Sequence, residues 1–334
     1  MGLALEGNQP CSLQRYHDRA HVLATDVTRR DPDNVGTRAD GRALELRGSG
    51  ANRVTFLLRT PELVLGEFHC PPDDDLWITD NNIGDLSHVV WPFTTVKIRR
   101  SGFGTICADA NTVMLYNPGT EYRRRRVAPS GDRSLFLALR PTLLQLLPAA
   151  VVQTHGAGFT AGHVWCSAQA WLVKESLVAA ARSGRADTMQ LEEMALSATY
   201  HALSDVLPRG AAASSRGRVR VRIEEARMLL GQDLDEPLHV TAIAKVLGVS
   251  PFHLARQFRD LTGTSMYAYR QHLRVRTAVQ RIFDEPRCDL SAVAADQGFA
   301  SHSHFTAACR RTFGVTPSAL RARLHPSDSR PGPG

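Results

Sequence analysis

The chain carries one pattern twice, reading VTAIAKVLGVSPFHLARQFRDLTGTS at residues 240–265 and LSAVAADQGFASHSHFTAACRRTFGVT at residues 290–316. Each copy has a short stretch with apolar residues three and four apart, a turn with a glycine, and a second stretch that begins at a hydroxyl residue. This order is typical of a helix-turn-helix unit. Gly248 corresponds to Gly298 and Ser250 to Ser301, so the turn of the second copy is one residue longer.

In the first copy, Ser250 suits the cap of the second helix, and Pro251 suits its first position, where no N–H is needed inside the helix. Helical spacing then places Leu254 and Phe258 on the buried face. The other residues face outward or flank this surface, and those expected to contact a partner are Ser250, Phe252, His253, Ala255, Arg256, Gln257 and Arg259.

In the second copy, the same spacing buries Phe305 and Cys309 and turns Ala307 outward. The residues expected to contact a partner here are Ser301, His302, Ser303, Thr306 and Arg310. Ala307 stands where the first copy has Arg256, and an alanine side chain donates no hydrogen bond. We therefore expect weaker recognition by the second unit.

Charge is distributed unevenly along the chain. Residues 216–325 contain 17 Lys and Arg against 10 Asp and Glu, which gives this segment the +7 formal charge of the entire chain. The residues before it carry equal numbers of both signs. A basic C-terminal third beside a neutral remainder is expected of a nucleic-acid-binding module attached to a part that does not touch nucleic acid.

The C-terminal third resembles the AraC/XylS family of bacterial transcription regulators in the runs GVSPFHLARQFRDLTGTS, YAYRQHLRVRTA and GFASHSHFTAACRRTFGVTPSALR. The resemblance implies two helix-turn-helix units joined by a long helix, with the second helix of each unit in the major groove of double-stranded DNA. It also implies RNA polymerase and a second subunit as partners. The twelve residues named above would then contact DNA. The sequence departs from the family pattern at Ala307, where many members carry Arg, and at Cys309, where Phe is usual.

Within the first two thirds of the chain, the pattern of polar and apolar residues changes near Arg53. Residues 1–52 are polar and rich in Gly, Asp and Arg, and we expect part of them to be poorly ordered. Short apolar runs separated by turn residues then predict an antiparallel β-sandwich or barrel up to Pro141, within a regulatory domain of residues 53–150. The resemblance favours a cupin-like barrel, so the predicted fold class is α+β.

Helical spacing predicts helices over Ala168–Ala181 and Met189–Leu207, within a segment of residues 160–207. They either cover the barrel or also pair two subunits. A small-residue linker is predicted at 208–217 and a DNA-binding domain at 218–323, with its units near 238–263 and 290–314. Residues 324–334 are too rich in Pro and Gly to fold.

The β-rich region offers candidates for a small-molecule effector site, namely Trp77, His88, Trp91 and Arg124. The aromatic residues are equally suited to an ordinary core, and the arginine run at 123–126 to a solvated edge, since a strand turns only every second residue inward. His69 and His88, with Cys70 nearby, fall short of a metal ligand set, so no metal, cofactor or catalytic residue is predicted. The six cysteines are widely spaced, which argues against a disulfide framework or a zinc ribbon.

No apolar run approaches the roughly 20 residues of a membrane-spanning helix, and the N-terminus lacks a signal-peptide layout. These observations predict a cytoplasmic, nucleoid-associated regulator with no membrane partner. Two other functions remain open at this stage: a cupin-type enzyme tethered to DNA, and an architectural DNA-binding protein without an effector. The sequence leaves the effector, the operator and the direction of regulation open.

Overall fold

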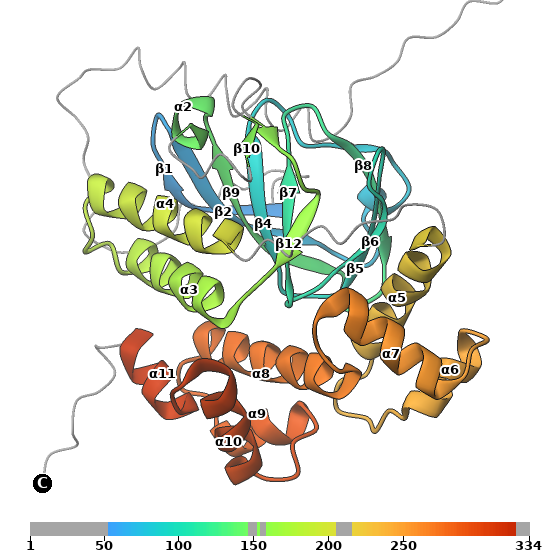
Figure 1. The fold of residues 1–334 in the computed structure, drawn as a ribbon. Helices are drawn as coiled ribbons and strands as arrows, with labels where there is room; N and C mark the ends of the chain where they lie inside the picture. The colour runs from blue at the N-terminus through green and yellow to red at the C-terminus, as the bar shows by residue number, and fades with distance from the viewer. Residues whose placement is uncertain (1–52, 146–151, 154–157, 205–215, 325–334) are drawn as a thin grey trace, which may run out of the picture.

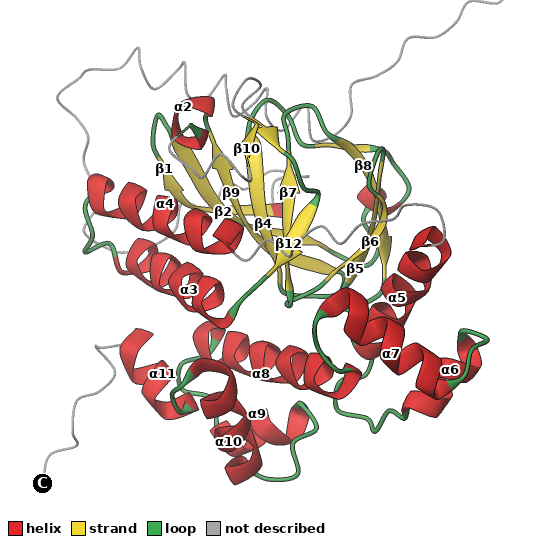
Figure 2. Ribbon diagram, viewed as in Figure 1, coloured by secondary structure: helices red, strands yellow, loops and turns green. Residues whose placement is uncertain are grey.

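A computed structural model describes residues 53–145, 152–153, 158–204 and 216–324. A β-rich part with two helices against it lies above an all-helical part in Figures 1 and 2. The α+β organisation expected from the sequence is confirmed. The N-terminal segment 1–52, most of the linker at 208–217 and residues 325–334 of the tail lie outside the described residues.

The β-rich part consists of two main antiparallel sheets. The order in the first is β1 (Val54–Arg59), β2 (Leu63–Cys70), β9 (Asp132–Leu139), β4 (Ser87–Pro92), β7 (Thr112–Tyr116) and β12 (His163–Trp165). The order in the second is β3 (Asn81–Asn82), β8 (Glu121–Arg126), β5 (Val96–Arg100) and β6 (Gly104–Ala108). A separate pair is formed by β10 (Val152–Gln153) and β11 (Gly158–Phe159), and short helical turns occur at η2 (Asp75–Trp77) and α2 (Pro141–Leu144).

Strand β7 shows how the two sheets and the helices share one core. All five of its residues are buried. Successive strand residues point to opposite faces, and Met114 and Tyr116 join the apolar cluster between the two sheets, whereas Val113 and Leu115 join the cluster under the helices. Both faces of this strand are therefore covered, which explains its nearly uninterrupted apolar sequence.

The expectation that strands end at Pro141 is wrong. Strand β12 completes the first sheet, where His163 pairs with Met114 and Trp165 with Thr112. The strands after Pro141 are two or three residues long. Such segments are too short to show an alternating pattern, so only pairing with distant residues defines them.

Helices α3 (Ala168–Ser183) and α4 (Thr188–Ser204) pack on each other and cover the outer face of the first sheet. The Ser167 hydroxyl caps α3 by accepting a hydrogen bond from the Ala170 amide at 3.0 Å. The helix ends at Gly184, whose φ of 62° is in the left-handed region that glycine tolerates best. Helices were expected over Ala168–Ala181 and Met189–Leu207, and both are present, although residues 205–207 lie outside the described residues.

The all-helical part contains α5 (Arg216–Leu230), α6 (Val240–Val246), α7 (Pro251–Thr262), α8 (Met266–Asp284), α9 (Leu290–Asp296), α10 (His302–Phe313) and α11 (Pro317–Leu324). Helices α6 and α7 form the first helix-turn-helix unit, and α9 and α10 form the second. The long helix α8 lies between the units and below the β-rich part (Figure 1). No helix of the described residues is both long and apolar enough to cross a membrane.

The end of β6 and the turn that follows it join the β-rich part, through buried polar groups, to α5 and α8, which pack against the first unit. The Tyr269 hydroxyl on α8 donates to Asp109 at 2.5 Å and accepts from the Arg227 guanidinium of α5 at 2.7 Å. Arg227 also bonds the Cys107 carbonyl oxygen at 2.6 Å and Glu224 at 2.7 Å. We call Cys107, Asp109, Glu224, Arg227 and Tyr269 the polar junction.

Farther along α8, Arg276 continues these contacts. Its guanidinium donates to the Ala110 carbonyl oxygen at 2.9 Å, to the Asn111 side chain at 2.7 Å and to the Cys166 carbonyl oxygen at 2.5 Å. The Asn111 amide in turn donates to the Tyr269 carbonyl oxygen at 3.0 Å. The helix that spaces the two units is thus hydrogen-bonded to one turn of the β-rich part.

The second unit joins the β-rich part through apolar side chains. Trp171 of α3 packs against Phe313 of α10, with ring centroids 4.9 Å apart, and against Phe283 of α8 at 5.7 Å. These residues belong to one cluster that runs from the first sheet through α3 to the core of the second unit. We call Trp171, Phe283 and Phe313 the aromatic junction.

Candidate nucleic-acid interface

Helix α7 begins and ends as the sequence predicts. The Ser250 hydroxyl accepts from the His253 amide at 3.3 Å, and Pro251 occupies the first helical position. Gly263, with a φ of 72°, ends the helix by donating its N–H to the Arg259 carbonyl oxygen. Leu254 and Phe258 are fully buried, so the opposite face of α7 is fixed toward solvent.

The outward face of α7 combines an aromatic ring with two cations. Phe252 is 78 % exposed, and Ala255, Arg256 and Arg259 are exposed beside it. An exposed phenylalanine at the start of a recognition helix suits contact with a thymine methyl group, and arginine suits the two acceptors of guanine. The face thus has the chemistry required to read bases.

The predicted contacts His253 and Gln257 form a local pair at the edge of this face. Their side-chain Nε2 atoms are 2.8 Å apart, and the Gln257 oxygen accepts from the Arg222 guanidinium of α5 at 3.1 Å. Sequence reasoning missed Arg222, although arginine recurs at every second position from Arg216 to this residue.

Helix α10 repeats this construction with a less polar outward face. The Ser301 hydroxyl accepts from the His304 amide at 3.1 Å, and Gly314 ends the helix with a φ of 76°. Phe305 and Cys309 are fully buried. The exposed residues of α10 are His302, Ser303, Ala307, Arg310 and Arg311.

Two of the predicted contacts have a structural function in this conformation, and the hydroxyl of a third is buried. The hydroxyls of Ser250 and Ser301 are used in capping, so these residues position the recognition helices. The Thr306 hydroxyl is buried without a hydrogen-bond partner among the described residues, so base contact through it requires a change of rotamer. The twelve predicted residues otherwise lie at the exposed or half-exposed surface of their units.

Helix α8 holds the units at a fixed separation. It has 19 residues, which at 1.5 Å per residue span about 28 Å. Arg270 donates to the Asp233 and Glu236 carbonyl oxygens at 2.6 and 2.8 Å, and Arg274 donates to that of Leu234 at 2.6 Å. These bonds tie α8 to the loop between α5 and α6 and so hold the first unit against it.

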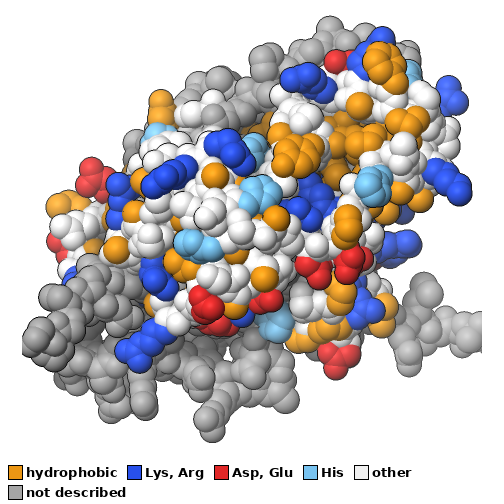
Figure 3. Space-filling model, turned by 90° about the horizontal axis from the view of Figure 1, so that it is seen from below, with side chains coloured by type: hydrophobic (Ala, Val, Ile, Leu, Met, Phe, Trp, Pro, Cys, Tyr) orange, Lys and Arg blue, Asp and Glu red, His pale blue; other side chains and the backbone are white. Residues whose placement is uncertain are grey.

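The face seen from below carries several separate Lys and Arg side chains, with acidic groups between some of them (Figure 3). Separate cations are adequate for phosphate contacts, because each neutralises one phosphate and releases its counterion.

The structure does not bring the four predicted effector residues into one site. Trp91 belongs to the core under the helices, whereas Trp77 packs against the cluster between the sheets. His88 lies three positions from Trp91 on β4 and therefore on the other face of the strand. Its Nδ1 atom is 3.0 Å from the Leu86 carbonyl oxygen.

Arg124 is buried, and alternation along β8 leaves Arg123 and Arg125 exposed; Arg126, the last residue of the strand, is exposed as well. The Arg124 guanidinium bonds Asp132 at 2.8 Å and the Tyr122 hydroxyl at 2.6 Å. Burial raises the pKa of Asp132, and the neighbouring Arg124 partly offsets that effect. The charge of Arg124 is thus already matched within the barrel.

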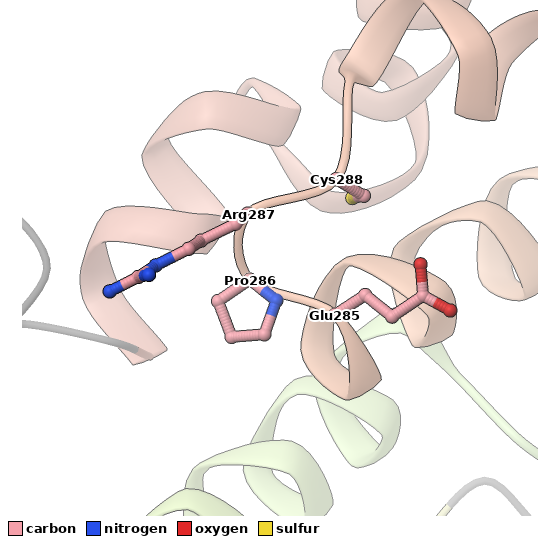
Figure 4. Close-up of a pocket in the computed structure, with 4 residues that line it drawn as sticks. All are labelled: Glu285, Pro286, Arg287 and Cys288. Carbon is pink, nitrogen blue, oxygen red and sulfur yellow. The ribbon is translucent and has the colours of Figure 1, made fainter.

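An open depression of about 410 Å³ lies on the loop between α8 and α9. It is lined by Glu285, Pro286, Arg287 and Cys288, and the side chains of Glu285 and Arg287 point in opposite directions (Figure 4). None of the predicted effector residues lines it. Among the described residues, no group of three or more His, Cys, Asp or Glu side chains is arranged to hold a metal ion.

Two exposed recognition helices on one rigid support define a double helix-turn-helix DNA-binding protein. A family model described as a helix-turn-helix domain matches residues 243–323. The regulatory protein SoxS of Escherichia coli (strain K12) is 34% identical over 104 residues, which cover 30% of this chain and 94% of SoxS. The chain belongs to the AraC/XylS family of transcription regulators.

Other relatives match a similar share of the chain. The HTH-type transcriptional regulator GlxA of Rhizobium meliloti (strain 1021) is 38% identical over 90 residues, which are 27% of this chain and 28% of GlxA. A crystal structure of a transcriptional regulator from Chromobacterium violaceum, described by its AraC-type DNA-binding domain, shares 30% identity. It covers 34% of this chain and 96% of its own, with a TM-score of 0.30.

Proposed function

We propose that this chain is a sequence-specific transcription regulator that inserts α7 and α10 into successive major grooves of its operator. The observation that carries the proposal is the exposure of both outward helix faces on units spaced by the single helix α8. The span of α8, with the packing of each unit added, approaches the roughly 34 Å between successive major grooves on one face of DNA.

A footprint tests this geometry. DNA selected from a random duplex library with the full chain serves as the operator. One bound chain should protect two major-groove segments about ten base pairs apart. Protection confined to one groove would show that only one unit docks, and binding without sequence preference would support an architectural DNA-binding protein.

Within this proposal, Arg256 reads guanine and Phe252 packs on a thymine methyl, while Arg259 and Arg310 bind phosphates. His302 and Ser303 supply the weaker reading by α10. His253, Ala255, Gln257 and Thr306 flank these contacts, and Ser250 and Ser301 hold the helix starts in place.

We further infer that the barrel responds to a small-molecule effector. Two contacts support this inference: Cys107 at the end of β6 accepts a hydrogen bond from α5, and Ala110 of the following turn accepts one from α8. A change in the barrel would thereby alter how these helices and the units they carry are oriented. Arg124, between the two sheets, is the best candidate for binding an anionic effector, which would have to compete with Asp132.

A thermal-shift screen of the full chain against small carboxylates and phosphates tests this inference. A specific ligand should raise the Tm by mass action, and Arg124→Gln should abolish the rise.

The remaining partners are part of the same proposal. Met189 and Tyr200 are exposed on one face of α4, at 75 % and 50 %, which suits pairing with a second subunit. Light scattering across protein concentrations tests this, and Tyr200→Glu should shift a dimer toward monomer. RNA polymerase as a partner and a cytoplasmic, nucleoid-associated location follow from action at promoters.

A further inference from the structure

Helix α5 begins with a run in which arginine occupies every second position, at Arg216, Arg218, Arg220 and Arg222. With 3.6 residues per turn, Arg218 and Arg222 fall on one face because they are four residues apart, and Arg220 falls on another. The run therefore does not form one uniform basic surface. Its two faces have different neighbours.

The buried side of α5 sets the direction of these faces. Ile223, Ala226 and Leu230 pack into the core of the first unit. Arg227 faces the barrel through the polar junction, and Arg220 lies on the same face of α5 because it is seven residues, or about two turns, earlier. Arg220 consequently lies toward the barrel.

Arg218 and Arg222 lie on the side of α5 that faces α7. The guanidinium of Arg222 donates to the Gln257 oxygen at 3.1 Å, and the Gln257 nitrogen is 2.8 Å from His253 Nε2. These groups form a continuous polar chain from α5 to the recognition helix. Arg218 is exposed one turn before Arg222, so it extends the same edge toward the N-terminus of α5.

We propose that Arg218 and Arg222 bind the phosphate backbone of DNA beside the groove that α7 enters. Arginine retains its charge at all accessible pH values, and its planar fork matches two phosphate oxygens. The acidic residue Glu225 lies on the same face, but beyond Arg222 and away from Arg218, so positive charge is concentrated at the N-terminal half of α5. This assignment rests on the proposed docking of the first unit in DNA and adds a contact from outside the helix-turn-helix.

The test measures how binding of the full chain to a labelled mixed-sequence duplex of about 30 base pairs depends on salt between about 50 and 200 mM. Each lost phosphate contact should reduce the slope of log K against log salt by about 0.9, which corresponds to about eightfold weaker binding near 0.1 M salt. Arg218→Gln and Arg222→Gln should each show this change, and the double variant should show about twice the change in slope.

Two variants separate a phosphate contact from other effects. Arg220→Gln removes the same charge from the barrel side of the same helix and should leave the slope within error of the unaltered chain. Arg222→Lys should keep the slope, because it keeps the cation. A change of slope with Arg220→Gln equal to that with Arg218→Gln would reduce the effect to net charge and overturn the proposal.

Further variants separate the loss of a contact by α5 from the loss of DNA binding by the whole chain. If Arg256→Ala and Arg259→Ala weaken DNA binding while the double variant at Arg218 and Arg222 keeps its slope, the first unit docks and α5 does not touch DNA. If the unaltered chain shows no salt-dependent binding to any duplex, DNA binding itself is contradicted. Thermal melting of every variant verifies that the protein is folded.

Discussion

The two helix-turn-helix units have the same capping, the same buried positions and the same terminal glycine, yet they differ in both their outer and their inner contacts. The first presents Phe252 and Arg256 to solvent and is held to the barrel through α5 and α8, by the hydrogen bonds of the polar junction and its ion pair between Arg227 and Asp109. The second presents Ala307 at the position equivalent to Arg256 and is held by the aromatic junction.

The two units are therefore attached to the barrel by different kinds of contact. Apolar contacts are non-directional, so the aromatic junction fixes the second unit through buried area. Hydrogen bonds depend on distance and angle, so the polar junction gives the first unit a defined orientation. A displacement that breaks these bonds leaves buried polar groups unpaired, which lowers the stability of the docked arrangement. The unit with Arg256 on its outward face is thus the one attached through direction-dependent hydrogen bonds.

The largest expected effect comes from the aromatic junction. Trp171 is 3 % exposed, and Trp171→Ala should lower the free energy of unfolding by about 3–5 kcal/mol because it leaves a cavity beside Phe283 and Phe313. Chemical denaturation followed by circular dichroism measures this. The control Ile78→Ala, at an 86 % exposed position, should change it by less than about 0.5 kcal/mol. Equal effects of the two variants would show that the aromatic rings do not hold the second unit.

Removal of one oxygen from the polar junction should have the next largest effect. Tyr269→Phe deletes the hydroxyl between Asp109 and Arg227 and should cost about 1–3 kcal/mol, because buried polar groups lose a partner. Tyr267→Phe, on the exposed side of the same helix, is the matched control. Hydrogen exchange should quicken in α5 and remain unchanged in α10, and the reverse pattern would assign the polar junction to the second unit.

Base reading should be as unequal as the two outward faces. Arg256→Ala should remove about 1–3 kcal/mol of preference for operator over scrambled DNA, whereas His302→Ala and Thr306→Ala should remove less. Ala307→Arg should strengthen recognition by α10. Competition binding at one fixed salt concentration measures all four variants. If Arg256→Ala weakens binding to both DNAs equally, Arg256 is a phosphate contact and the first unit reads sequence through other residues.

A smaller effect on stability, which depends on pH, should come from His163 of β12. Burial lowers the pKa of His163 to about 3, and Arg227, Arg220 and Arg100 act in the same direction. The unfolded chain binds this proton near pH 6.5, so the free energy of unfolding falls as the pH falls from about 6.5 toward 3. His163→Gln removes this contribution and should reduce the loss by about 1 kcal/mol near pH 5.5. Denaturation at several pH values measures it, and parallel profiles for both proteins would contradict the assignment.

Local sequence patterns were sufficient for the units themselves. Ser250 with Pro251, Ser301, and the glycines at 263 and 314 mark where the recognition helices begin and end, and the structure has those caps. Helical spacing also identified the buried residues and the outward faces. These features follow from contacts within a few residues, which the order of the amino acids determines directly.

Local patterns did not predict the surroundings of the candidate effector residues or the strands after Pro141. Alternation correctly turned Arg124 inward, but no local pattern shows that Asp132 matches its charge or that Trp91 and His88 lie on opposite faces of β4. Strand β12 has three residues and is defined by its pairing with β7, about fifty residues earlier in the chain.

The sequence alone determined a chain with two helix-turn-helix units, a basic C-terminal third and an asymmetry between Arg256 and Ala307. The tertiary structure decided how the units are attached to the barrel, because the partners of the junctions are far apart in the chain. Arg227 and Cys107 are separated by 120 positions, and Tyr269 and Asp109 by 160. Such buried polar pairs form only when two separately patterned domains dock, since each charged group remains in water until its partner replaces that water.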